Sequence, residues 1–170
     1  MSRGLLLLSF FFVAGCRDVG SVGDLDAGAG TAQLPPTGSD ALAVWLEGGA
    51  YRDWHCEAAP HPAREPSPHG TDRVCSNDAL SAHGDGPYPV GAANVKELFD
   101  DRGALAGHAV YRRVLEGGGG ESWYWFERAG GVLYADGLGG GGAPRSSCVG
   151  CHQGAGPSRF GHDLVYTQVR

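Results

Sequence analysis

The run Cys148-Val149-Gly150-Cys151-His152 is the part of the sequence best suited to chemistry. Two thiols separated by two residues, with a histidine directly after the second, have the spacing at which a c-type haem is attached. The thiols would add to the two vinyl groups of the porphyrin, so they must lie a fixed distance apart on one helical turn. His152 would then lie under the iron as its proximal ligand. We therefore expect one covalently attached haem c.

A Cys-x-x-Cys pair has other uses. A thioredoxin-like redox pair belongs in a βαβ context, and no such pattern surrounds these residues. A structural zinc ion needs a second ligand pair, whereas Cys56 and Cys75 stand 19 residues apart. A third alternative is that the motif is accidental and the protein is a lipoprotein stapled by a disulfide.

Methionine, the usual sixth ligand of electron-transfer cytochromes c, occurs only as Met1, which belongs to an export signal. The sixth position is therefore vacant, filled by water, or taken by one of six histidines: His55, His61, His69, His83, His108 and His162. A vacant position favours small-molecule binding or chemistry over simple electron relay.

Cys56 and Cys75 remain after haem attachment. In an oxidising compartment, two spare cysteines that flank a proline-rich loop predict a disulfide. Closing a loop of about 20 residues would stabilise the fold by ~3 kcal/mol. The alternative is two unpaired, buried thiols.

The N-terminus predicts export. Arg3 precedes an apolar run from Leu5 to Val13, which is too short to span a bilayer but suits a signal peptide. The run continues into Val13-Ala14-Gly15-Cys16, which resembles a bacterial lipobox. We expect residues 1–15 to be a lipoprotein signal peptide and Cys16 to be lipidated, anchoring the protein to a bacterial membrane on its periplasmic side. An ordinary secretory signal is the alternative. Residues 16–38 predict a flexible tether.

Residues 39–170 predict one α+β domain. Ser39 or Asp40 should N-cap a helix through 41–46 that ends at Gly48-Gly49, and Asn77 should cap a short helix over 78–82. Residues 58–72 hold four prolines and predict a loop. Strand-like runs over 92–99, 108–115, 122–128 and 131–135 are joined by Gly-rich or Asp-Gly turns and predict an antiparallel meander, with a possible last strand over 164–169. A short haem-binding helix should follow the meander.

The aromatic run Trp123-Tyr124-Trp125-Phe126 should alternate between the two faces of its strand. Either the sheet is buried on both sides, or one face packs against a large flat cofactor. The formal net charge is −6, which excludes tight binding to a nucleic-acid backbone.

These residues together resemble the cytochrome P-460 family. The resemblance covers residues 41–170 and rests on Tyr88-Pro89-Val90-Gly91-Ala92, Val95-Lys96-Glu97-Leu98, Trp123-Tyr124-Trp125, Gly137, Cys148 to His152 and His162-Asp163-Leu164-Val165. An upstream part looks like the lipoprotein branch of that family: Gly49-Ala50-Tyr51, Trp54, Pro68-His69-Gly70, Arg73-Val74 and Asn77.

The resemblance implies a β-rich domain, often a homodimer, that binds nitric oxide or oxidises hydroxylamine at one haem. In the hydroxylamine-oxidising type a lysine is also bonded to the porphyrin, and Lys96 is the only lysine here. Lys96 is either near the haem edge or an ordinary ion-paired strand residue. A distal carboxylate would take up protons, and Glu97, Glu121 and Glu127 are the candidates. Electron transfer or gas binding without turnover is the alternative function. The redox partner is left open.

Overall fold

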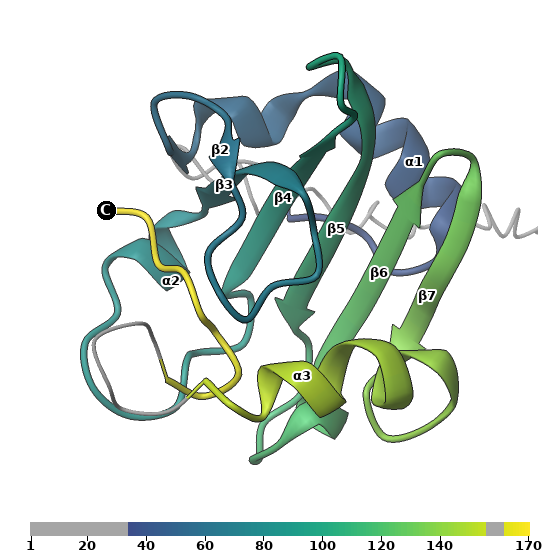
Figure 1. Cartoon of the computed structure of the whole chain (residues 1–170). Helices are drawn as coiled ribbons and strands as arrows, with labels where there is room; N and C mark the ends of the chain where they lie inside the picture. The colour runs from purple at the N-terminus through teal and green to yellow at the C-terminus, as the bar shows by residue number, and fades with distance from the viewer. Residues whose placement is uncertain (1–33, 156–161) are drawn as a thin grey trace, which may run out of the picture. The chain divides into compact units, whose positions relative to one another are not determined.

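The computed structural model describes residues 34–155 and 162–170, which belong to the compact unit 31–170. Seven antiparallel strands form one sheet in these residues (Figure 1). The strands are β1 (His55–Cys56), β2 (His61–Pro62), β3 (Thr71–Ser76), β4 (Ala93–Phe99), β5 (Leu105–Arg113), β6 (Trp123–Ala129) and β7 (Val132–Leu138). Their order is β1-β3-β4-β5-β6-β7, and β2 also pairs with β3. The expected β-rich α+β class and the four-stranded meander are confirmed.

Short helices connect and cover the strands. They are α1 (Ser39–Gly48), η1 (Ala50–Asp53), α2 (Asp78–Ser81), η2 (Gly120–Ser122), the π-helical segment η3 (Pro144–Val149) and α3 (Gly150–His152). Helix α1 ends where Gly49 adopts a left-handed conformation and its N–H reaches the Leu46 carbonyl. The side chain of Asn77 accepts a hydrogen bond from the Leu80 N–H, as an N-cap should. Both predicted helices are therefore confirmed, but the predicted cap of α1 is wrong: its N-cap residue is Gly38, which has no side chain to cap it, and Ser39 and Asp40 lie inside the helix.

The sheet separates two hydrophobic clusters. Alternate residues of β4–β6 pack against α1, and we call this the α1 face; it carries Val95, Val110, Tyr124 and Phe126. The opposite residues lie against η3 and α3, and we call this the pocket face; it carries Tyr111, Trp123 and Trp125. Figure 1 shows α1 and α3 on opposite sides of the sheet. The aromatic run thus alternates as predicted and is buried on both faces.

The region before β4 departs from the sequence expectation. Residues 58–72, expected as a loop, contain β2 and the start of β3. Both β1 and β2 have only two residues, which is too short for an alternation of apolar and polar residues to predict a strand. Their pairing partners in β3 lie 9 to 21 residues away along the chain.

The predicted last strand over 164–169 is wrong. Asp163 and Leu164 have positive φ angles of 45° and 71°, and the chain turns there with one isolated bridge between His162 and Val165. Beyond the turn, side chains replace a strand partner. Asn94 donates to the Thr167 carbonyl, and Ser81 donates to the Val169 carbonyl.

Residues 34–38, expected as the end of a flexible tether, contact the sheet: Arg112 donates to the Pro35 carbonyl and Tyr124 Oη accepts from the Gly38 N–H. The predicted signal peptide, Cys16 and the tether up to residue 33 lie outside the described residues. Over the described ranges, no helix has the length and apolarity needed to cross a membrane.

Candidate functional site

A cavity opens between the pocket face of the sheet, the loop after β2 and the helical segment that carries the Cys-x-x-Cys-His run. It encloses about 1210 Å³ of space not filled by atoms, part of which is open to solvent. Cys148, Cys151 and His152 line it together with Tyr166. The sheet contributes Val74, Lys96, Ala109, Tyr111, Trp125 and Glu127, and the loop contributes Arg64 to His69. The structure thus places Lys96 and Glu127 in the same cavity as the predicted haem-binding residues Cys148, Cys151 and His152.

The motif lies on one continuous helical stretch formed by η3 and α3, so the two thiols are separated by less than one turn. Glycines allow this stretch to sit close to the sheet. A Cβ on Gly139 would lie 2.3 Å from the Gly120 carbonyl oxygen and 2.5 Å from Val149, and a Cβ on Gly120 would lie 2.5 Å from Val149. The Gly-rich turns are therefore packing surfaces for the helix as well as loops.

Both motif cysteines are free thiols, and Cys148 is buried. Burial raises the pKa of the Cys148 thiol to about 12. A reactive redox cysteine needs the opposite shift, because the thiolate is the nucleophile. Neither thiol belongs to a group of three convergent metal ligands among the described residues. The redox-pair and zinc alternatives therefore find no support in this geometry.

His152 is held in one tautomer and one orientation. Its Nδ1 lies 2.6 Å from the Leu164 carbonyl oxygen, which can only accept, so Nδ1 carries the proton and Nε2 is left as a lone-pair donor. Burial lowers the pKa of His152 to about 4, which keeps the ring neutral. Its ring packs edge-on against Trp125 and Tyr111 at centroid distances of 4.8 and 5.2 Å. A carbonyl-anchored neutral imidazole is the usual arrangement of a metal-binding histidine.

The strand register divides the cavity floor into two rows. Tyr111 pairs with Trp125 in one row, and Lys96, Ala109 and Glu127 form the next. The two thiols and the oriented imidazole line one cavity, and this set of groups fits a haem c.

The row of Lys96, Ala109 and Glu127 carries charged groups. Lys96 Nζ lies 3.1 Å from Asp72 Oδ2, and the two side chains are 16% and 3% exposed. Glu127 Oε1 lies 3.7 Å from His69 Nδ1. Burial raises the pKa of Glu127, and burial together with the Lys96 charge lowers the pKa of His69 to about 4. Ala109 between Lys96 and Glu127 is small, which leaves the centre of this row open.

The other two carboxylate candidates lie elsewhere. Glu97 points to the α1 face, where Tyr51 donates to its Oε1 at 2.7 Å and the Arg52 and Arg73 guanidinium groups lie 3.5 and 3.6 Å away. It neighbours Lys96 in sequence, so strand alternation sends the two side chains to opposite faces. Glu121 is exposed on η2. Neither carboxylate lines the cavity, which removes Glu97 from the candidate site.

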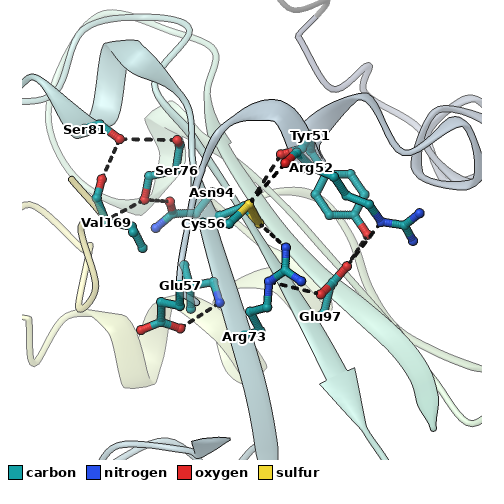
Figure 2. Close-up of a disulfide and its surroundings, with 12 residues drawn as sticks. Tyr51, Arg52, Cys56, Glu57, Arg73, Ser76, Ser81, Asn94, Glu97 and Val169 are labelled. Atoms are coloured by element: carbon teal, nitrogen blue, oxygen red, sulfur yellow. Dashed lines mark hydrogen bonds and ion pairs between the residues drawn. A yellow bond between two sulfur atoms is a disulfide. The ribbon is translucent and has the colours of Figure 1, made fainter. Parts of the chain in front are cut away.

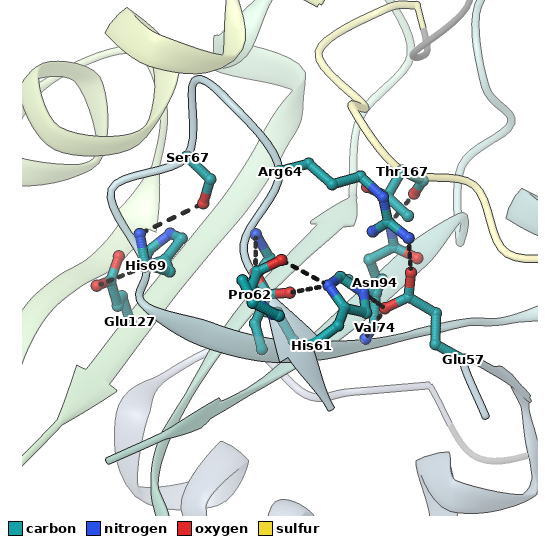
Figure 3. A network of polar contacts seen from close by, with 12 residues as sticks. Glu57, His61, Pro62, Arg64, Ser67, His69, Val74, Asn94, Glu127 and Thr167 are labelled. Carbon is teal, nitrogen blue, oxygen red and sulfur yellow. Dashed lines mark hydrogen bonds and ion pairs between the residues drawn. The ribbon is translucent and has the colours of Figure 1, made fainter. Parts of the chain in front are cut away.

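A polar network lies beside the cavity (Figure 3). Glu57, His61 and Asp72 bring ligand atoms within 4.8 Å of one another. However, Arg64 Nη2 lies 2.5 Å from Glu57 Oε1, and Lys96 pairs with Asp72. Two cations already balance the two carboxylates, so we interpret the cluster as an ion-pair network rather than as a metal site.

The second cysteine pair is confirmed as a disulfide between Cys56 and Cys75. These residues are direct partners in the β1–β3 ladder, with Cα atoms 4.0 Å apart. Figure 2 shows Cys56 close to the backbone of Tyr51 and Arg52, and both cysteines pack with the α1 cluster. The disulfide therefore closes the sheet edge on the α1 face, away from the cavity.

The chain matches no family model, no curated protein and no solved structure. The site therefore rests on its own geometry. The sequence did not identify Asp72 as part of the candidate site, nor Tyr111 and Tyr166, which also line the cavity. Asp72 could have been found only from the β3–β4 register, because it lies 24 residues before Lys96.

Proposed function

We propose that this protein is an exported c-type monohaem cytochrome of the cytochrome P-460 type, which binds or oxidises a small nitrogen compound such as nitric oxide or hydroxylamine. The observation that carries the proposal is the arrangement of His152. Its Nδ1 is fixed by the Leu164 carbonyl, and its free Nε2 belongs to the same cavity as the thiols of Cys148 and Cys151.

A bound haem would supply an iron that accepts electrons and binds nitrogen ligands. Cys148 and Cys151 would fix its edge, and His152 would bind its proximal side. Trp125 and Tyr111 support the imidazole and exclude water from it. The residues of this chain thus provide attachment, orientation and a dry proximal side.

Glu127 is the carboxylate in position to exchange protons with a bound nitrogen compound. Hydroxylamine loses protons when it is oxidised, and Glu127 is a half-buried carboxylate whose pKa burial raises, so it holds an accepted proton better than an exposed carboxylate does. Lys96 would present its ammonium, paired with Asp72, on the same row. A non-catalytic gas-binding protein would use the same pocket without turnover.

The test is expression of the full chain with export and c-type haem maturation, followed by acid–acetone extraction. We expect the haem to remain on the protein and one haem to add to its mass. Haem that is extracted by acid–acetone would refute the proposed attachment. The two functions separate by turnover: an enzyme reduces an added electron acceptor continuously with hydroxylamine, whereas a binding protein only takes up nitric oxide stoichiometrically.

The membrane anchor is tested separately. We propose that Cys16 carries the lipid and that Cys16→Ser releases the haem-containing protein from the membrane fraction. Cys75→Ser is the matched control, because it removes a cysteine but leaves the lipobox intact. If Cys16→Ser protein still sediments with membranes, the lipobox interpretation is wrong.

A further inference from the structure

The cavity contains a second histidine besides His152. Of the six other histidines, all of which are described, His69 alone lines the cavity. His108 contacts Tyr51 on the α1 face, His55 pairs with Asp78, and His61 is bonded to Glu57. His83 bonds the Gly86 carbonyl, and His162 stacks on Tyr88. Only His69 is therefore placed to meet a group held by His152.

His69 and His152 enter the cavity from different segments. His152 comes from α3 and packs on the Tyr111–Trp125 row, whereas His69 comes from the loop between β2 and β3 and lies against Glu127, in the next row. The two imidazoles thus reach the same cavity from two separate segments of the chain.

Both rings turn Nδ1 towards an oxygen, but only Nδ1 of His152 is within hydrogen-bond distance of it. His152 turns Nδ1 to a carbonyl oxygen, and His69 turns Nδ1 towards Glu127 Oε1 at 3.7 Å. In the described residues, no hydrogen bond is made by Nε2 of His69. A histidine that binds a metal through Nε2 usually has a carboxylate or carbonyl at Nδ1. Glu127 supplies that outer partner.

The loop that carries His69 is closed by its own hydrogen bonds. The Ala63 N–H donates to the Gly70 carbonyl, the Ser67 N–H donates to the Arg64 carbonyl, and the His69 N–H donates to Ser67 Oγ. These bonds place His69 over the sheet without tying its ring to the sheet by a hydrogen bond. The ring could therefore move without a change in the hydrogen bonds that close the loop.

We propose that His69 is the sixth ligand of the haem iron in the resting protein and that a small ligand binds by displacing it. This inference depends on the proposed haem attachment and adds the control of ligand entry. It replaces a permanently open distal position by one that a loop histidine closes.

The experiment uses the full-length holoprotein and the variants His69→Gly, His69→Leu and, as control, His61→Gly. We expect a low-spin ferric haem, by optical and electron paramagnetic resonance spectra, in the wild type and in His61→Gly. Both His69 variants should be high-spin, and added imidazole should restore the low-spin spectrum of His69→Gly. A high-spin wild type, or a low-spin spectrum in both His69 variants without imidazole, would overturn the proposal.

Kinetics of cyanide binding give a second measurement. In the wild type the observed rate should reach a plateau as cyanide increases, because dissociation of His69 limits binding. In His69→Gly the rate should rise linearly and exceed the wild-type plateau by about tenfold or more, because the competent state is fully populated. Equal, linear rates in both proteins would contradict displacement. Acid–acetone extraction is done first, so that a failure of haem attachment is recognised separately from a failure of the His69 assignment.

Discussion

The two faces of the sheet use the same residue types for different purposes. On the α1 face a cysteine pair forms a disulfide, and Glu97 lies between Arg52 and Arg73. On the pocket face the second cysteine pair consists of free thiols, and Glu127 borders a cavity. Residue type alone therefore does not distinguish the structural face from the candidate functional face.

The difference lies in how many partners each face supplies. Glu97 has a hydrogen bond and two guanidinium groups around it, so its charge is compensated by neighbours. Among the described residues, the ion-pair partner of Glu127 is His69, at 3.7 Å, and burial raises the pKa of Glu127 although the Lys96 charge acts against this. Groups with their partners already in place stabilise the fold, whereas groups left incompletely paired in a cavity are available to a ligand.

The largest expected effect follows from removing the thiols of the pocket face. Cys148→Ala/Cys151→Ala should abolish covalent haem, measured by haem staining after denaturing electrophoresis and by mass. Each single variant should keep one thioether bond. Cys56→Ala/Cys75→Ala is the matched control and should retain covalent haem. Equal haem loss in both double variants would remove the distinction between the faces.

The next effect concerns the disulfide of the α1 face. Cys56→Ala/Cys75→Ala should lower the free energy of unfolding by ~3 kcal/mol, because it reopens a loop of about 20 residues in the unfolded chain. Urea denaturation of the oxidised holoprotein measures this change. The haem spectrum should stay as in the wild type. A shifted spectrum would mean that the two faces are coupled through the sheet.

A smaller effect on stability should distinguish the Glu97 carboxylate from the Glu127 carboxylate. Glu97→Gln should lower the free energy of unfolding by about 1–3 kcal/mol, because Arg52 and Arg73 lose their charged partner. Glu127→Gln should leave stability nearly unchanged but alter ligand binding. Because burial raises the pKa of Glu127, its carboxyl takes up a proton above its ordinary pKa as pH falls.

The measurement is the pH dependence of nitric oxide binding. The wild type should show a transition above pH 4.5, Glu97→Gln should keep it, and Glu127→Gln should lose it. A transition that is lost in Glu97→Gln instead would restore the assignment made from sequence.

The smallest effect is expected at Lys96. Its ammonium is paired with Asp72, so we expect no bond to the porphyrin, only two thioether bonds and an ordinary c-type ferrous spectrum. Lys96→Arg should leave the ferrous Soret band in place. A red-shifted wild-type band, lost in Lys96→Arg, together with a Lys96 peptide on the haem peptide would establish the cross-link.

The sequence predicted those elements that local patterns define. The meander β4–β7 follows from alternation between Gly-rich turns, and the start of α2 follows from its Asn77 cap, whereas α1 begins after Gly38 without a side-chain cap. Strands β1 and β2 and the turn at Asp163-Leu164 depend on long-range partners, which local periodicity does not contain.

The candidate site divides in the same way. Cys148, Cys151 and His152 are contiguous and could be predicted. The choice of Glu127 over Glu97 and the position of Asp72 required the register of the sheet. His69 required the path of the loop after β2, which runs over the sheet and not along its edge.

The buried position of Cys148 would set the order of folding and attachment if the proposed haem is bound. Burial raises the pKa of the Cys148 thiol to about 12, so in the folded chain it would be a poor nucleophile for a vinyl group. Attachment would then have to precede packing of the helical stretch against the sheet. Haem delivery and folding would compete, and a chain that folded first would be left without its cofactor.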